Sequence, residues 1–206
     1  MPMRMALRTL LLSVAIGSPV SPSSAADANK VMDALLTCNT AFFETLRANQ
    51  AAFGVPTVTP HSDPNAASPN PGATRVRGVN AKFPKTVEAY GLHLDGYMQV
   101  VLLNSGKPGT YWWGFDVAET PSDVVAAIVG RVVGANFEKK GQSHGWLQEL
   151  DPVWRNQGGI EHRSPWRMLL VEPSSNGTRL RCGVFRERMG SMTELPDAAE
   201  LFSDKP

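Results

Sequence analysis

The strongest catalytic pattern in this chain of 206 residues is Gly141-Gln142-Ser143-His144-Gly145, which matches the G-x-S-x-G sequence of serine hydrolases. Asp151 and His162 follow in the chain order of that class, with Ser143 as nucleophile, His162 as base and Asp151 orienting the base. The chemistry requires the serine on a sharp turn between a buried strand and a helix. Residues 136–140, which precede it, are mostly polar and charged. We therefore predict a surface loop and no catalytic site, with a periplasmic serine hydrolase as the alternative.

Metal chemistry has little support in the sequence. No pair of histidines has the i, i+4 spacing of a helical zinc site, and there is no Cys-x-x-Cys. We predict no metal site and no cofactor. The four histidines are His61, His93, His144 and His162.

Three carboxylates, Asp95, Asp116 and Glu119, lie near the ends of an expected hairpin. A glycosidase would need two acids on either side of a sugar cleft. Solvated acids at strand ends are the simpler interpretation, and the sequence alone does not place them relative to one another.

Aromatic side chains gather in the expected strand 110–117, where both faces are apolar. Tyr111, Trp113 and Phe115 alternate with Trp112. A strand that is apolar on both faces is covered on both sides, so burial in a central strand is one interpretation. The other is a partner-binding surface with Trp112 and Tyr111 as anchors, because exposed Trp and Tyr side chains anchor interfaces.

Arginine is concentrated between residues 155 and 188, where seven arginines accompany three glutamates. Arg179 and Arg181 are two residues apart in an expected strand, so both belong to its outward face. Guanidinium groups bind carboxylate and phosphate, which makes a peptide, a lipid headgroup or an acidic protein conceivable ligands. A solvated face with local ion pairs is the alternative.

The first 26 residues have the three parts of a secretory signal peptide. Arg4 and Arg8 precede an apolar stretch, 10–16, that is shorter than the 20 or so residues needed to span a bilayer. Small residues at 23–26 then provide a cleavage site. No cysteine lies there to serve as a lipobox. We predict a signal peptide over 1–26, a single domain over 27–206 without a transmembrane anchor, and a periplasmic or secreted location.

The charge of the mature chain is nearly balanced. The signal peptide contains two of the 20 basic residues and none of the 19 acidic ones, so the mature charge is 18 − 19 = −1. Such a chain has no overall electrostatic reason to bind nucleic acid. We predict no nucleic-acid partner.

The two cysteines, Cys38 and Cys182, are predicted to form a disulfide in an oxidising compartment. Cys38 continues the helical apolar stripe of Leu35 and Phe42. Cys182 belongs to the apolar side of the expected strand 178–185. Both sulfur atoms are therefore expected to point into one core.

Two helices and a long loop are predicted around the strands. The first helix is expected over 29–53, before Gly54, and a loop without regular structure over 54–75, which contains five prolines. A second helix is expected after Thr120, with Pro121 at its first position and Asp123 completing a capping box. Its predicted buried residues are Val125, Ile128, Val129 and Val132.

Glycine- and proline-rich turns separate two pairs of strands, 97–103 with 110–117 and 165–171 with 178–185. A further strand is expected over 76–83. This order predicts an α+β fold: a mainly antiparallel sheet built from two β-hairpins, with the N-terminal helix and the second helix packed on it and one disulfide.

We predict from these patterns an exported, non-catalytic protein that binds a protein or a small envelope ligand. Trp112, Tyr111, Arg179 and Arg181 are the predicted binding residues. A periplasmic inhibitor or immunity-type protein fits this size and disulfide. The second alternative, beside the hydrolase, is a structural homodimer subunit of the envelope, assembled through the first hairpin.

Overall fold

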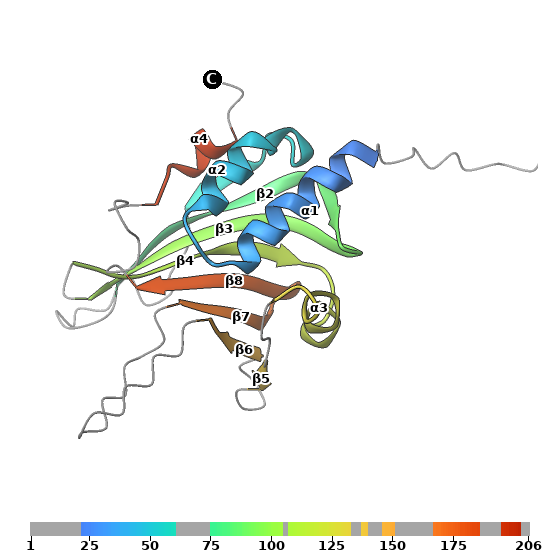
Figure 1. The fold of residues 1–206 in the computed structure, drawn as a ribbon. Helices are drawn as coiled ribbons and strands as arrows, with labels where there is room; N and C mark the ends of the chain where they lie inside the picture. Colours follow the sequence, from blue (N-terminus) through green and yellow to red (C-terminus); the bar gives the residue numbers. More distant parts are fainter. Residues whose placement is uncertain are drawn as a thin grey trace, which may run out of the picture.

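The structure is a computed structural model, and it describes residues 22–60, 75–104, 107–132, 137–139, 146–150, 167–185 and 195–202. Within these residues, helices pack on one eight-stranded antiparallel sheet in the order β1-β2-β3-β4-β8-β7-β6-β5 (Figure 1). The predicted α+β fold is confirmed. The strands are β1 (Thr57–Pro60), β2 (Arg75–Ala89), β3 (Leu92–Asn104), β4 (Lys107–Val117), β5 (Glu138–Lys139), β6 (Trp146–Glu149), β7 (Arg167–Ser174) and β8 (Gly177–Phe185). The helices are α1 (Pro22–Leu36), α2 (Ala41–Ala48), the 3-10 helix η1 (Gln50–Ala52), α3 (Pro121–Ile128) and α4 (Ala198–Leu201).

The prediction of one helix over 29–53 is wrong, because the chain breaks it at residues 37–40. Cys38 has a φ of 49°, in the left-handed region. The Thr37 hydroxyl donates to the Ala34 carbonyl at 2.8 Å, and the Asn39 side chain accepts the Ala41 N–H at 3.0 Å. Short polar side chains that bind nearby backbone groups compete with helical hydrogen bonds. The break separates α1 from α2, and both then pack on the same sheet.

The core lies between the sheet and the helices, and its centre is aromatic. The ring of Phe42, from α2, stacks on Tyr97 of β3 at 6.2 Å and on Trp113 of β4 at 6.4 Å between centroids. Phe53 stacks on Phe115 at 5.7 Å. Such pairs add about 0.5–1.5 kcal/mol each to the free energy gained by burying their area. This packing positions the central strands.

Helix α3 joins the same core. The Thr120 hydroxyl accepts the Asp123 N–H, so the predicted cap is confirmed. Val124 and Ile128 are fully buried with the residues beneath α1 and α2. The prediction that Val129 is buried is wrong: the helix ends at Ile128, and Val129 in the following turn is 44% exposed.

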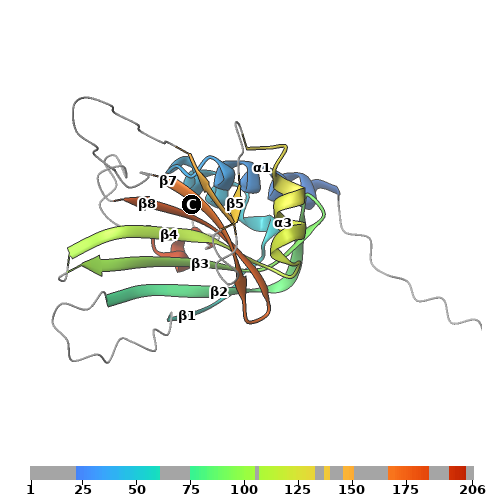
Figure 2. The same ribbon diagram turned by 90° about the horizontal axis from the view of Figure 1, so that it is seen from below.

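The helices therefore share one face of the sheet. Figure 2 shows α1 along one side of the strands, while the other side of β2, β3 and β4 has no helix among the described residues. We call this second side the helix-free face. Across the described ranges, every helix is too short or too polar to cross a membrane.

The predicted disulfide between Cys38 and Cys182 is confirmed, with the two Cα atoms 5.3 Å apart. It joins the turn between α1 and α2 to β8, across 144 positions of sequence. The helices are thereby fixed to a strand near the middle of the sheet.

The loop predicted over 54–75 contains a strand, so the expectation that it has no regular structure is wrong for β1. Thr57 pairs with Lys82, and Pro60 pairs with Val79. All four residues of β1 are exposed at the edge of the sheet. Proline is tolerated there because an edge strand has one side without ladder hydrogen bonds. Residues 61–74 lie outside the described part of the chain.

The predicted strand 76–83 is the first half of a longer one. β2 continues to Ala89 and turns into β3 through Tyr90 and Gly91, whose φ values are 54° and 75°. Two successive positive φ values are the geometry of the tight turns that join antiparallel strands. This third hairpin is missing from the predicted fold, and both of its strands contribute residues to a pocket on the helix-free face.

Candidate functional site

Trp112 lies on the helix-free face, in a small apolar cluster with Met98 and Val100. The Cζ atom of Arg181 is 4.2 Å from the centroid of the indole ring. The ring lies against Gly183, where an added Cβ would be 2.5 Å from it. Trp112 is consequently 8% exposed, so the indole is covered and is not presented as an exposed anchor.

Tyr111, the other predicted aromatic anchor, faces the helices. It is 1% exposed and belongs to the main core. Tyr111 is therefore not part of the helix-free face.

Arg179 and Arg181 both lie on the helix-free face, and each is paired with a carboxylate. Arg179 Nε is 2.9 Å from Asp116 Oδ1 on β4, and an Arg181 terminal nitrogen is 2.9 Å from Glu172 Oε1 on β7. Burial lowers the pKa of the Arg181 guanidinium, and the charge of Glu172 opposes this effect. The two pairs cross-link three neighbouring strands.

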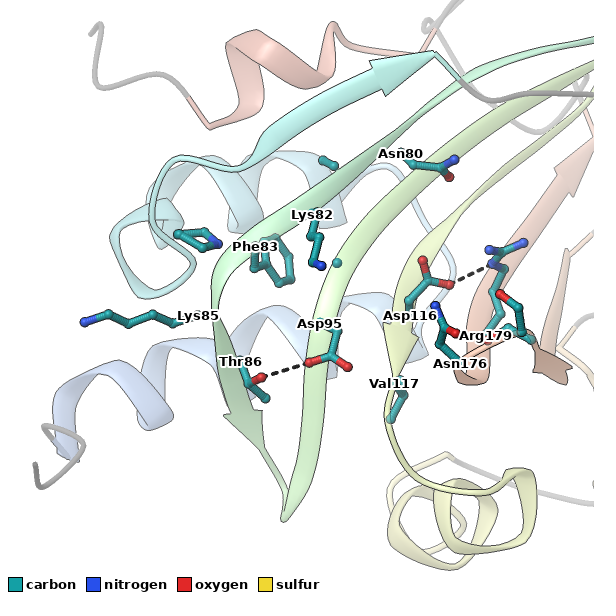
Figure 3. A pocket seen from close by; sticks show the side chains of 15 residues that line it. Asn80, Lys82, Phe83, Lys85, Thr86, Asp95, Asp116, Val117, Asn176 and Arg179 are labelled. Carbon is teal, nitrogen blue, oxygen red and sulfur yellow. Dashed lines mark hydrogen bonds and ion pairs between the residues drawn. The ribbon is translucent and has the colours of Figure 1, made fainter. Parts of the chain in front are cut away.

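A pocket of about 550 Å³ opens on the helix-free face beside the Arg179–Asp116 pair (Figure 3). One wall is the second half of β2, the floor is β3 and β4, and the opposite wall is the turn between β7 and β8. The charged and amide side chains that face it are Lys82, Asp95, Asp116, Asn176 and Arg179, while Lys85 lines its rim and extends outward in Figure 3.

Two irregularities in the sheet create this pocket. The pairing of β2 with β3 shifts between Lys82 and Val87, and the pairing of β3 with β4 shifts between Leu94 and Gly96. Bulges of this kind redirect side chains and often lie next to functional sites. Asp95 and Gly96 both line the pocket as a result, while Leu94 before them is buried in the core.

The pocket combines paired and unpaired charges. Asp95 accepts a hydrogen bond from the Thr86 hydroxyl at 2.9 Å, and Asp116 holds Arg179. The ammonium groups of Lys82 and Lys85 form no ion pair with the described residues. In Figure 3 the Lys82 side chain points from β2 toward β3, whereas the Lys85 side chain extends away from Asp95 and Asp116.

Glu119, the third carboxylate noted in the sequence, lies outside this pocket and binds His93. Its side chain accepts from the His93 backbone N–H at 3.0 Å and contacts the ring nitrogen Nδ1. This hydrogen bond raises the pKa of His93 against a smaller opposing effect of burial. The pair ties the start of β3 to the segment before α3.

The predicted alternative catalytic residues, Ser143, Asp151 and His162, lie outside the described residues, as does the whole loop 141–145. The hydrolase alternative stays a prediction. Among the described residues, no three His, Cys, Asp or Glu side chains are grouped as metal ligands.

Comparisons with known proteins found no match for this chain. No family model matches the sequence, no curated protein matches it, and no solved structure matches the fold. The geometry of the pocket is therefore the basis for the function proposed next.

Proposed function

We propose that this protein is exported to the periplasm or secreted, and that it binds a small envelope ligand in the pocket on the helix-free face without transforming it. The signal-peptide pattern over 1–26 supports export. The Cys38–Cys182 disulfide agrees with an oxidising compartment, where such bonds persist.

The observation that carries the binding role is the convergence of polar side chains on one concave site. Donors and acceptors reach it from β2, β3, β4 and the β7–β8 turn. Ligand sites are concave and contain a few polar groups that fix the orientation of the ligand. Of the predicted binding residues, Arg179 contributes directly to this site, and Arg181 lies two residues along the same strand.

The side chains in the pocket favour binding over catalysis. The described lining contains no histidine and no cysteine, the usual proton carrier and the strongest nucleophile. Asp95 and Asp116 are two carboxylates in one pocket, as a glycosidase needs. However, Asp116 is paired with Arg179, and both carboxylates are partly open to solvent, whereas a general acid needs apolar surroundings that keep it protonated.

Export is tested by expressing the full chain and sequencing the N-terminus of the product. We expect the product from the periplasm or medium to begin at Ala26 or Asp27. A protein that stays in the cytoplasm with residues 1–26 attached would overturn this part of the proposal.

Binding is tested by blocking the pocket. Ser175 lies in the β7–β8 turn and is exposed, so Ser175→Trp places a large ring in the pocket without disturbing the core. Ser122→Trp, on the exposed side of α3, is the matched control. After incubation with small molecules extracted from the envelope and desalting, mass spectrometry identifies what each protein retains.

We expect wild type and Ser122→Trp to retain a compound that Ser175→Trp loses. Equal retention by all three proteins would exclude the pocket as the site. A compound that wild type returns chemically altered, and Asp95→Asn returns intact, would contradict the non-catalytic role.

A further inference from the structure

Two opposite charges in the pocket have no ionic partner among the described residues. The charged side chains that face it are Lys82, Asp95, Asp116 and Arg179. Arg179 and Asp116 neutralise each other, with Nε 2.9 Å from Oδ1. Lys82 forms no ion pair with the described residues, and the partner of Asp95 is a neutral group, the hydroxyl of Thr86. One cation and one anion of balanced charge are therefore left for a ligand.

The register of the sheet brings these two charges to neighbouring positions. Lys82 on β2 pairs with Gly96 on β3, and Asp95 is the residue before Gly96. Directly paired Cα atoms in an antiparallel sheet are about 4.5–5.5 Å apart. The shift in register between Leu94 and Gly96 brings Asp95 to the pocket, and the Lys82 side chain points toward β3 (Figure 3). The ammonium and the carboxylate thus face one space from adjacent strands without forming an ion pair with each other.

This arrangement discriminates between classes of ligand. A ligand that covers a charge without pairing it costs free energy, because the charge loses water and gains no partner. An anion alone would pair with Lys82 and be repelled by Asp95, and an amine alone would do the reverse. A neutral sugar would offer both charges hydrogen bonds but no opposite charge. A zwitterion pairs with both at once, through two charge-assisted hydrogen bonds.

The rest of the pocket suits neutral polar groups. The opposite wall has the hydroxyls of Ser174 and Ser175 and the amide of Asn176, which both donate and accept. The pair of Arg179 with Asp116 adds no net charge. The volume of about 550 Å³ is within the usual range of small-molecule sites, about 300–1,000 Å³. It leaves space for a polar side chain or a peptide group beyond the two charges.

We infer that the pocket binds a small zwitterion of the amino-acid class, whose carboxylate is held by Lys82 and whose ammonium group is held by Asp95. The inference rests on the proposed function, because it names the ligand class of the same pocket. The recognised chemistry is one ammonium group and one carboxylate in a single small molecule, with the opposite wall left for its neutral part.

NMR chemical-shift titration of the isotope-labelled protein tests the inference, because it measures weak as well as tight binding. Glycine, β-alanine, 4-aminobutyrate and diglycine carry both charges at increasing separation. Butyrate carries the carboxylate alone, and butylamine carries the ammonium group alone. We expect at least one zwitterion to bind about tenfold more tightly than butyrate and than butylamine. Higher salt should weaken this binding, because ions screen exposed charges.

Variants then assign the two ends of the ligand. Lys82→Ala should weaken the preferred zwitterion about tenfold, the loss expected for one hydrogen bond to a charged group, and remove its advantage over butylamine. Asp95→Asn should remove its advantage over butyrate, while the Asn oxygen still accepts from Thr86. Lys85→Ala is the matched control and should bind like wild type, because Lys85 is also an exposed lysine of β2 but extends away from the pocket (Figure 3).

Three results would overturn the inference. The first is that no zwitterion binds more tightly than both butyrate and butylamine. The second is a loss of affinity in Lys85→Ala as large as in Lys82→Ala. The third is a compound that wild type retains and Ser175→Trp loses but that lacks one of the two charges; the pocket then binds a ligand as proposed, and only the ligand class is wrong. Equal binding of the zwitterions by wild type and Ser175→Trp would instead exclude the pocket as the site, and the proposed binding function with it.

Discussion

The guanidinium of Arg181 stacks on the indole of Trp112, with Cζ 4.2 Å from the ring centroid. Two glycines make room for this stack. An added Cβ on Gly183 would be 2.5 Å from the indole, and one on Gly114 would be 2.9 Å from the Arg181 Cβ. The aromatic residue on the helix-free face is thus covered by a charged side chain from the neighbouring strand, and the apolar cluster needs no helix above it.

Gly183→Ala should destabilise the protein by about 1–3 kcal/mol, the usual cost of inserting an atom into a packed site. The added methyl group would displace the Trp112 ring and with it Arg181. Gly130→Ala is the control: Gly130 has open space around its Cα, and it should be neutral or slightly stabilising. Urea denaturation followed by circular dichroism measures both. Equal stability of the two variants would show that the stack does not require Gly183.

Glu172→Gln should destabilise the protein because it removes the charge that faces Arg181. The Arg181 side chain is 20% exposed, and its Nε has no hydrogen-bond partner among the described residues. Losing one charge-assisted hydrogen bond to a partly buried group costs about 1.5–3 kcal/mol. A double-mutant cycle with Arg181→Met isolates the interaction. A coupling energy near zero would mean that Trp112, and not Glu172, holds the guanidinium.

The sequence predicts the disulfide because two independent periodicities agree. Cys38 continues a helical stripe, and Cys182 alternates with polar residues in a strand, so both point to the core. The break in the first helix was not predictable from the same stripe, because the apolar spacing continues through it. What ends α1 is the local hydrogen bonding of Thr37 and Asn39, which a count of apolar positions does not detect.

The pocket escaped prediction for a related reason. Strict alternation would place Asp95 and Gly96 on opposite faces of β3, and only the shift in register brings both to the helix-free face. The sequence does contain one sign of this shift. Leu94 and Tyr97 are both buried apolar residues, yet they are three positions apart, whereas strict alternation would place buried residues two positions apart. Arg179 could be assigned to the correct face, but its carboxylate partner comes from β4, 63 positions away.

Replacing both Cys38 and Cys182 with alanine should destabilise the protein by about 4–5 kcal/mol at most, because the disulfide closes a loop of 144 positions. Cys38 has a φ of 49°, which costs a non-glycine residue about 1–2 kcal/mol. Cys38→Gly with Cys182→Ala should therefore recover part of the loss. Urea midpoints of the wild type, oxidised and reduced, and of both double variants measure these effects. An unchanged midpoint on reduction would contradict the prediction.

The His93–Glu119 pair makes stability depend on pH. The hydrogen bond to Glu119 raises the pKa of His93 in the folded protein. His93 therefore contributes to folding stability below its unfolded-state pKa of about 6.5, and this contribution is lost as the pH rises through the raised pKa. Burial by itself raises the pKa of Glu119, but hydrogen bonds from the His93 amide and ring lower it overall. Glu119 therefore contributes to folding stability above its ordinary pKa of 4.5. This contribution is lost as the pH falls through the lowered pKa.

The loss of unfolding free energy caused by His93→Gln should consequently be largest between about pH 4.5 and 6.5, where both partners are charged. It should decrease progressively toward pH 9. The measurement is the free energy of unfolding of wild type and variant at intervals from pH 4 to pH 9. The other three histidines are present in both proteins, so their titration cancels in the difference. The loss of unfolding free energy caused by Glu119→Gln should also decrease above pH 6.5, because this variant removes the partner that raises the His93 pKa. A difference between wild type and His93→Gln that stays constant from pH 6 to pH 9 would mean that the ring is neutral in this contact.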